Sequence, residues 1–178
     1  KDRFHLYQAS VYDMPFAKGQ FDKVFCFGVI QHTPDVHKTV QSLISMAKPG
    51  AEVLVDFYCV NGWWTKLQAK YMFRPVTKKW GNEKLLNKIE KNVDWMMAAT
   101  SFFNRIGIGR FVNRFIPICD IKGTLPEGLS KQETREWCIL DTFDMFSPEY
   151  DQPQKISTVK KWFEENSMEQ VWGGEVHY

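Results

Sequence analysis

The residues best suited to catalysis or ligand binding follow an apolar stretch in the first third of the sequence. Residues 23–30 are nearly all apolar and β-prone, and Gln31 and His32 come directly after them. As a neutral imidazole, His32 could take a proton from a substrate or orient it. Gly28 would let the backbone approach a ligand closely. A polar loop histidine and a simple strand kink are the ordinary alternatives, and both stay open here.

These residues need a scaffold, and the flanking sequence predicts one. The continuous apolar run at 23–30 is typical of a parallel strand covered on both faces. Thr33-Pro34-Asp35 predicts a helix start with Thr33 as a possible cap, an apolar stripe continues to Ala47, and Lys48-Pro49-Gly50 ends the helix. Residues 51–57 predict a second buried strand, and the alternating residues 4–9 a further one. Strand, helix and strand with short links predict an α/β fold with a parallel sheet.

The middle of the chain differs in charge and pattern. Residues 62–114 hold eleven Lys and Arg against three acidic residues. Aromatic residues at helical spacing and a Lys66, Lys70, Arg74 stripe predict an amphipathic helix over 63–74 with a cationic face in water. Ser130 and Glu133 form a capping box that predicts a helix to about Leu140. We therefore expect an α/β domain from 1–60 and 137–178, and a helical basic insertion over 61–136.

Several functions fit that basic insertion. The first is a helical lid whose apolar side packs over a pocket. The second is a surface that meets an acidic membrane or a lipid-linked substrate through the basic helix 63–74. Nucleic-acid binding comes last and is considered unlikely, although lysines interleaved with aromatics are compatible with it.

Metal and disulfide chemistry have little support in the sequence. The four cysteines stand singly, at least 19 residues apart, and no Cys-x-x-Cys pair occurs. We therefore expect no metal site and a reducing, cytoplasmic location. No run of 18 apolar residues and no signal-peptide pattern is present.

Four motifs in order carry a family resemblance. They are Ala9-Ser10-Val11-Tyr12-Asp13-Met14-Pro15-Phe16, Phe21-Asp22-Lys23-Val24, Phe27-Gly28-Val29-Ile30-Gln31-His32-Thr33-Pro34-Asp35 and Lys48-Pro49-Gly50-Ala51. In order and spacing they resemble class I S-adenosylmethionine-dependent methyltransferases, specifically the methyltransferase type 11-like group. The tail from Asp141 to Met168 resembles the same group. The resemblance implies a Rossmann-like parallel sheet, here partial, with the helical insertion as a lid.

The resemblance also implies roles for individual residues. S-adenosylmethionine would be the cofactor, with Ser10 and Val11 at the adenine and Phe27, Gly28 and Val29 beside it, because ligands bind beyond the carboxyl ends of parallel strands. Most relatives carry Asp at the position of Ser10. His32, Asp144 and Tyr150 become the candidate catalytic residues. The implied reaction is methyl transfer to a small-molecule acceptor.

One expected feature of this family is missing from the sequence. A glycine-rich turn after the first strand normally holds the methionine part of the cofactor, and neither Gly107-x-Gly109 nor Gly173-Gly174 follows a buried strand. We therefore expect the chain to be the carboxy-terminal portion of the enzyme, a fragment with poor cofactor affinity of its own. The alternative function is a non-catalytic, partner-binding module on a methyltransferase-like scaffold.

Overall fold

The computed structural model describes residues 4–60, 62–126 and 128–175, and they form two compact units. Unit 1 consists of residues 4–60 and 150–175, and unit 2 of residues 62–149. The second boundary thus follows residue 149, where the sequence suggested 136/137. The reason is that residues 131–146 form one unbroken helix, which packs within unit 2.

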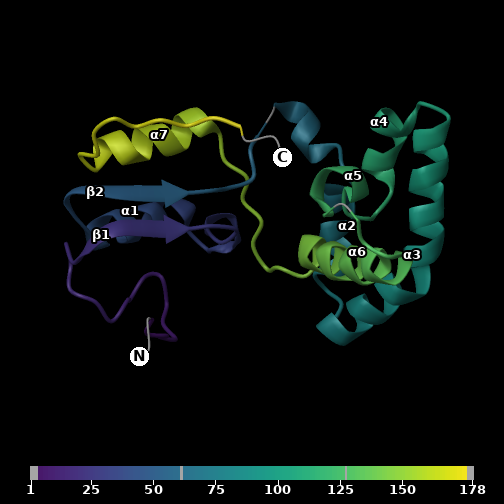
Figure 1. Ribbon diagram of the computed structural model, residues 1–178, viewed down its shortest axis with the longest axis horizontal. Coiled ribbons are helices and arrows are strands. Elements are labelled where there is room, and N and C mark those ends of the chain that lie inside the picture. Colours follow the sequence, from purple (N-terminus) through teal and green to yellow (C-terminus); the bar gives the residue numbers. More distant parts are fainter. Residues whose placement is uncertain (1–3, 61, 127, 176–178) are drawn as a thin grey trace. The chain divides into compact units, whose positions relative to one another are not determined.

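Unit 1 contains a strand–helix–strand motif (Figure 1). Strand β1 spans Phe21–Cys26, the short 3-10 helix η1 Ile30–His32, helix α1 Val36–Met46, strand β2 Ala47–Val55 and helix α7 Ile156–Glu165. The two strands are parallel, with Val24 opposite Val53 and Cys26 opposite Val55. The predicted α/β class and the strand–helix–strand unit are confirmed.

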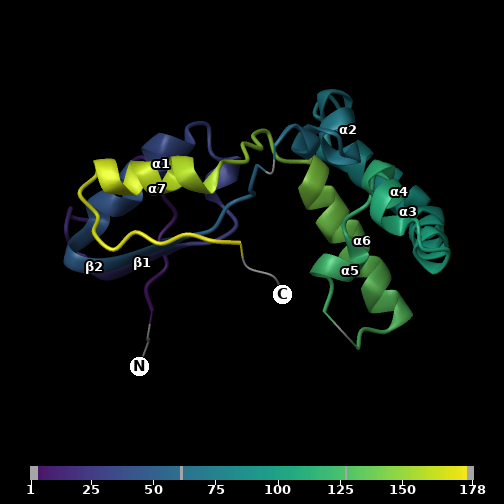
Figure 2. The ribbon, with the colours of Figure 1, turned by 90° about the horizontal axis from the view of Figure 1, so that it is seen from above.

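Only one face of this sheet is covered by helices among the described residues. Figure 2 shows α1 and α7 on the same side of the two strands. Val24, Cys26, Val53 and Val55 pack there against α1 and α7 residues such as Val40 and Phe163. The alternate residues of each strand point the other way, so the opposed pair Phe25 and Leu54 is exposed. The prediction of a strand covered on both faces is therefore wrong for the part of the chain that the structure describes.

Two further local predictions are corrected. Residues 4–9 form no strand. A strand needs a hydrogen-bonded neighbour, and in the described part of the chain the sheet consists of β1 and β2, so residues 4–9 have no strand to pair with. Helix α1 is capped by Asp35, whose side chain accepts from the Lys38 N–H at 2.9 Å. Thr33 lies two residues before this cap, and its hydroxyl donates to the Ile30 carbonyl at 2.7 Å.

Unit 2 is helical throughout. Its elements are η2 Trp63–Lys66, α2 Ala69–Thr77, α3 Asn82–Arg105, α4 Gly109–Val112, η3 Asn113–Phe115, α5 Ile121–Thr124 and α6 Lys131–Phe146. The capping box predicted at the start of α6 is present, with the Ser130 N–H donating to the Glu133 carboxylate at 2.8 Å. The helix runs to Phe146, beyond the expected end near Leu140.

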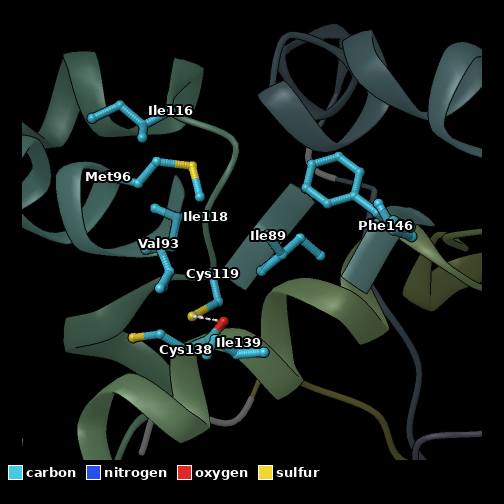
Figure 3. Close-up of a cluster of buried hydrophobic side chains, with 10 residues drawn as sticks. Ile89, Val93, Met96, Ile116, Ile118, Cys119, Cys138, Ile139 and Phe146 are labelled. Carbon is cyan, nitrogen blue, oxygen red and sulfur yellow. Dashed lines mark hydrogen bonds between the residues drawn. The ribbon is translucent and has the colours of Figure 1, made fainter. Parts of the chain in front are cut away.

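The core of unit 2 lies between α3, α6 and the segment that joins α4 to α5 (Figure 3). Helix α3 contributes Ile89, Val93 and Met96, helix α6 contributes Cys138, Ile139 and Phe146, and the joining segment contributes Ile116, Ile118 and Cys119. One polar side chain is fully buried beside them. The Thr142 hydroxyl accepts from the Cys119 N–H at 3.1 Å, which attaches the segment to α6.

The basic helix predicted over 63–74 is interrupted, and two of its three predicted cationic residues are buried instead of exposed. Residues 63–66 are a 3-10 turn, and α2 begins only at Ala69. Lys70 and Arg74 are buried, whereas the sequence pattern placed them in water. The Arg74 guanidinium donates to the Met145 and Pro148 carbonyls at 3.1 and 2.7 Å. The carbonyls at the end of α6 lack helical partners, so they attract this donor and draw the cationic side of α2 inward.

Candidate functional site

The carboxyl ends of β1 and β2 are tied together by a short hydrogen-bonded link. Gly28, two residues after β1, has φ +69°, a region that favours glycine. Its N–H donates to the carboxylate of Asp56, the first residue after β2, and the Asp56 N–H donates to the Cys26 carbonyl at 3.2 Å. No heavy atom lies within 4 Å of where a Gly28 side chain would begin, so the backbone here is open to a ligand.

His32 is oriented by the tail of the chain. Its Nδ1 lies 2.9 Å from the Tyr150 carbonyl oxygen. A carbonyl can only accept, so Nδ1 carries a proton in this contact, and Nε2 is the ring nitrogen left outside it. The His32 ring meets the Tyr58 ring edge-on, with centroids 5.7 Å apart. An imidazole held in this way presents Nε2 as the nitrogen through which it would act on a substrate.

The segment 150–154 is bound along the strand ends by Gln152 and Gln154. The Gln152 N–H donates to the Gln31 carbonyl at 2.9 Å, and its side-chain amide donates to the Thr33 and Pro34 carbonyls at 2.7 and 3.0 Å. The Gln154 N–H donates to the Tyr58 carbonyl at 2.8 Å. These bonds fix the Tyr150 carbonyl where His32 can reach it.

Ser10 and Val11 lie in a tight turn rather than at the end of a strand. The Asp13 N–H donates to the Ser10 carbonyl at 3.0 Å, and the Tyr12 N–H lies 3.2 Å from the Ser10 hydroxyl oxygen. The Val11 carbonyl accepts from the Ser42 hydroxyl of α1 at 2.5 Å. The Ser10 side chain is exposed, and Val11 packs on the hydrophobic core of unit 1.

The structure places most of the sequence-derived site residues in unit 1. Phe27, Gly28, Val29 and His32 all follow β1, Phe27 and Val29 are exposed, and the tail brings the Tyr150 backbone to His32. Asp144 lies in α6 of unit 2, with its side chain exposed. The contact of Tyr150 with His32 uses its main-chain carbonyl, not its phenol.

Sequence reasoning missed three residues of this edge: Asp56, Tyr58 and Gln152. Asp56 and Tyr58 follow the second strand as His32 follows the first, so the rule that ligands bind beyond strand ends could have found them. Gln152 offered no such signal, because its hydrogen bonds to residues 31–34 span more than 115 positions of sequence.

Other chemistries have no support in the described residues. Within them, no group of three or more His, Cys, Asp and Glu side chains is placed to hold a metal ion. All four cysteines are free. No helix in the described part of the chain is both long and apolar enough to cross a bilayer. The site at the strand ends offers backbone groups, apolar side chains, the Asp56 carboxylate and the His32 imidazole.

Comparison with known proteins agrees with this geometry. Residues 1–55 match the model of the family described as "Methyltransferase domain". An uncharacterised protein of Synechococcus sp. is 25% identical over 170 residues, which are 92% of this chain and 34% of that protein. No solved structure matches the chain.

Two further relatives are named for their activity. A tRNA U34 carboxymethyltransferase of Campylobacter curvus is 44% identical over 43 residues, 24% of this chain and 14% of that enzyme. One of Nautilia profundicola is 37% identical over 49 residues, 28% of this chain and 16% of that enzyme. The chain spans about a third or less of the length of these curated relatives. The resemblance to class I S-adenosylmethionine-dependent methyltransferases is thus confirmed over residues 1–55, which match the model of the methyltransferase domain.

Proposed function

We propose that the protein to which this chain belongs transfers a methyl group from S-adenosylmethionine to a small-molecule acceptor. One observation carries the proposal. The residues that match the methyltransferase domain are the same residues that form the strand–helix–strand unit of unit 1, whose carboxyl edge holds Gly28, Asp56 and His32. The two parallel strands would be part of a Rossmann-like sheet.

The residues at the strand ends fit one side of such a cofactor. Phe27 and Val29 expose apolar surface, and Gly28 leaves its backbone open, as an adenine ring requires. Ser10 offers an exposed hydroxyl where most relatives have a carboxylate, so its bond to an exocyclic amine would be weaker. Val11 would contribute an apolar contact through its partly buried side chain.

Methyl transfer depends mainly on how the acceptor is positioned against the cofactor. The cofactor supplies an activated sulfonium methyl group, so much of the rate enhancement comes from holding the acceptor in line and excluding water. His32, with the proton on Nδ1, would accept the acceptor's proton at Nε2. Asp144 and Tyr150 stay candidates for the same task. No metal is required.

The cofactor assignment can be tested by calorimetric titration of the full-length protein with S-adenosylmethionine. Ser10→Asp should tighten binding by about five- to tenfold, since hydrogen bonds to a charged group contribute about 1 kcal/mol more than neutral ones. Ser157→Asp is the matched control, because Ser157 is an exposed serine of α7. If the folded protein releases no heat at millimolar cofactor, the proposed function is wrong. Equal affinities for the two variants would remove Ser10 from the site.

RNA is the second candidate acceptor, and the sequence-based ranking of nucleic acid as unlikely is revised. The revision rests on the two relatives named tRNA U34 carboxymethyltransferases. Their similarity covers only 24% and 28% of this chain. It therefore supports an RNA acceptor only through the shared domain. Methyl transfer from labelled cofactor to total tRNA, but not to a metabolite extract, would decide for RNA.

The rival to both is a non-catalytic module that binds a partner through a methyltransferase-like scaffold. The two classes differ in how His32→Asn would behave. In an enzyme the variant lowers the rate of transfer while cofactor affinity is kept. In a binding module no transfer to any acceptor is detected, and the variant has no rate to lower.

A further inference from the structure

Unit 2 displays aromatic side chains on its surface in two neighbouring segments. The 3-10 turn η2 exposes Trp63 and Trp64, whose rings stack with centroids 3.7 Å apart. Helix α4 and the turn η3 expose Phe111 and Phe115. These four residues are large enough to form a substantial apolar patch, and exposing them in water is unfavourable.

Arg114 joins the two segments into one surface. Its guanidinium donates to the Trp64 and Leu67 carbonyls, each at 3.0 Å, and so fixes η2 against η3. Phe115 follows it directly, with the Arg114 guanidinium 6.0 Å from the ring centroid. We call this the aromatic surface, defined by its exposed side chains Trp63, Trp64, Leu67, Phe111 and Phe115.

The charge of these segments is uniform. Residues 62–82 and 95–119 contain eight Lys and Arg and no Asp or Glu. Lys66 and Arg110 are exposed and lie within the two segments that carry the aromatic residues. The only acidic residues between Gly62 and Arg114 are Glu83, Glu90 and Asp94, all on α3. An apolar surface whose own segments carry cations and no anions is complementary to an anionic surface with an apolar interior.

We propose that the aromatic surface binds an anionic lipid bilayer, with the tryptophans and phenylalanines at the level of the headgroups. Tryptophan prefers that level, and lysine and arginine beside it gain from anionic headgroups. The segments would lie in the interface without crossing it. This inference goes beyond the proposed methyl transfer and does not depend on it.

The kind of side chain exposed favours lipid over RNA. Single-stranded RNA would use the aromatic rings, on which its bases stack. Here α2 turns Lys70 and Arg74 into the protein and exposes Met72 and Val76 instead. Ile106 and Ile108, in the loop before α4, are exposed as well. Aliphatic side chains contribute nothing to base stacking, whereas a bilayer interface buries them favourably.

The test is co-sedimentation of the protein with vesicles of phosphatidylcholine alone or mixed equally with phosphatidylglycerol. We expect salt-sensitive binding to the mixed vesicles. The double variant Trp63→Ser/Phe111→Ser should lower the partition coefficient at least about tenfold, because two large apolar side chains leave the interface. Lys66→Gln/Arg110→Gln should lower it about fivefold for each charge removed, on the mixed vesicles only.

A matched control keeps the outcome interpretable. Trp172→Ser/Phe4→Ser removes the same residue types from unit 1, where they are 81% and 78% exposed, against 65% and 71% for Trp63 and Phe111. Circular dichroism on each variant confirms that it is folded. The proposal is overturned if the protein does not sediment with mixed vesicles at low salt, or if both double variants lose binding equally. It is also overturned if Trp63→Ser/Phe111→Ser abolishes binding of an RNA oligonucleotide while vesicles are not bound.

Discussion

Replacing Arg74 by alanine is the sharpest test of how unit 2 is held together. Arg74 is 7% exposed and donates from Nη1 to the Met145 carbonyl and from Nη2 to the Pro148 carbonyl. A hydrogen bond that involves a charged group contributes about 1.5–3 kcal/mol. Both bonds are lost in Arg74→Ala, but rehydration of the carbonyls recovers part of that free energy. We expect unit 2 to lose about 2–4 kcal/mol of its free energy of unfolding.

Two further variants separate hydrogen bonding from charge. Arg74→Lys keeps the charge but cannot reach two carbonyls in a fork, so it should lose about half as much, roughly 1–2 kcal/mol. Lys78→Ala removes an exposed cation one helical turn further on and should change stability by less than about 0.5 kcal/mol.

Urea unfolding followed by far-ultraviolet circular dichroism measures these differences, and hydrogen exchange of the α6 amides reports on unit 2 alone. If Arg74→Ala and Lys78→Ala unfold at the same urea concentration, with equal slopes, the two carbonyl bonds do not stabilise unit 2. These bonds would then not be the reason that the cationic side of α2 is buried.

Three other substitutions probe single features. Gly28→Ala meets no steric neighbour but must adopt φ +69°, so it should lower the unfolding free energy of unit 1 by about 1–2 kcal/mol in thermal melts, whereas Gly81→Ala, at φ −66°, carries no such backbone strain and should cost only about 0.5 kcal/mol through its place at the start of α3. Thr142→Val leaves the buried Cys119 N–H unpaired and should cost about 1–3 kcal/mol in urea, with partial rescue by Thr142→Ser; equal losses in both would refute a role for the hydroxyl. The hydrogen bond with Cys138 and burial raise the pKa of Cys119, so its proton is lost from the unfolded state first, and stability should fall as the pH rises above the ordinary cysteine pKa of about 8.5; Cys119→Ala should flatten this profile in urea titrations at pH 7 and 10.

The local elements were largely predictable from the sequence because their signals are short-range. The apolar run before His32, the stripe of α1 and the Ser130–Glu133 capping box all act within a few turns of chain. They predicted a parallel strand–helix–strand unit and a helical middle segment, and the structure shows both. The ordered motifs at residues 9–51 likewise sufficed to recognise a methyltransferase domain, which the comparison confirms for residues 1–55.

The site itself was predictable in part. Gly28 and His32 could be named because a strand end is visible in one sequence segment. The Tyr150 carbonyl that orients His32 could not be named, since the contact depends on Gln152 bonding to residues more than a hundred positions away. No periodicity carries such information.

What the sequence determined by itself is which residues form strands and helices in the order β1, α1, β2, and where cations and aromatics concentrate. Only the tertiary structure decided which way those residues face. Helical spacing marks two opposite faces on α2 but does not say which is buried, and the unpaired carbonyls at the end of α6 settle that by accepting from Arg74. The alternation in β1 likewise marks two faces, and only the position of α1 and α7 leaves Phe25 exposed. Direction of burial is a property of neighbours distant in sequence, which is why the tertiary structure alone decides it.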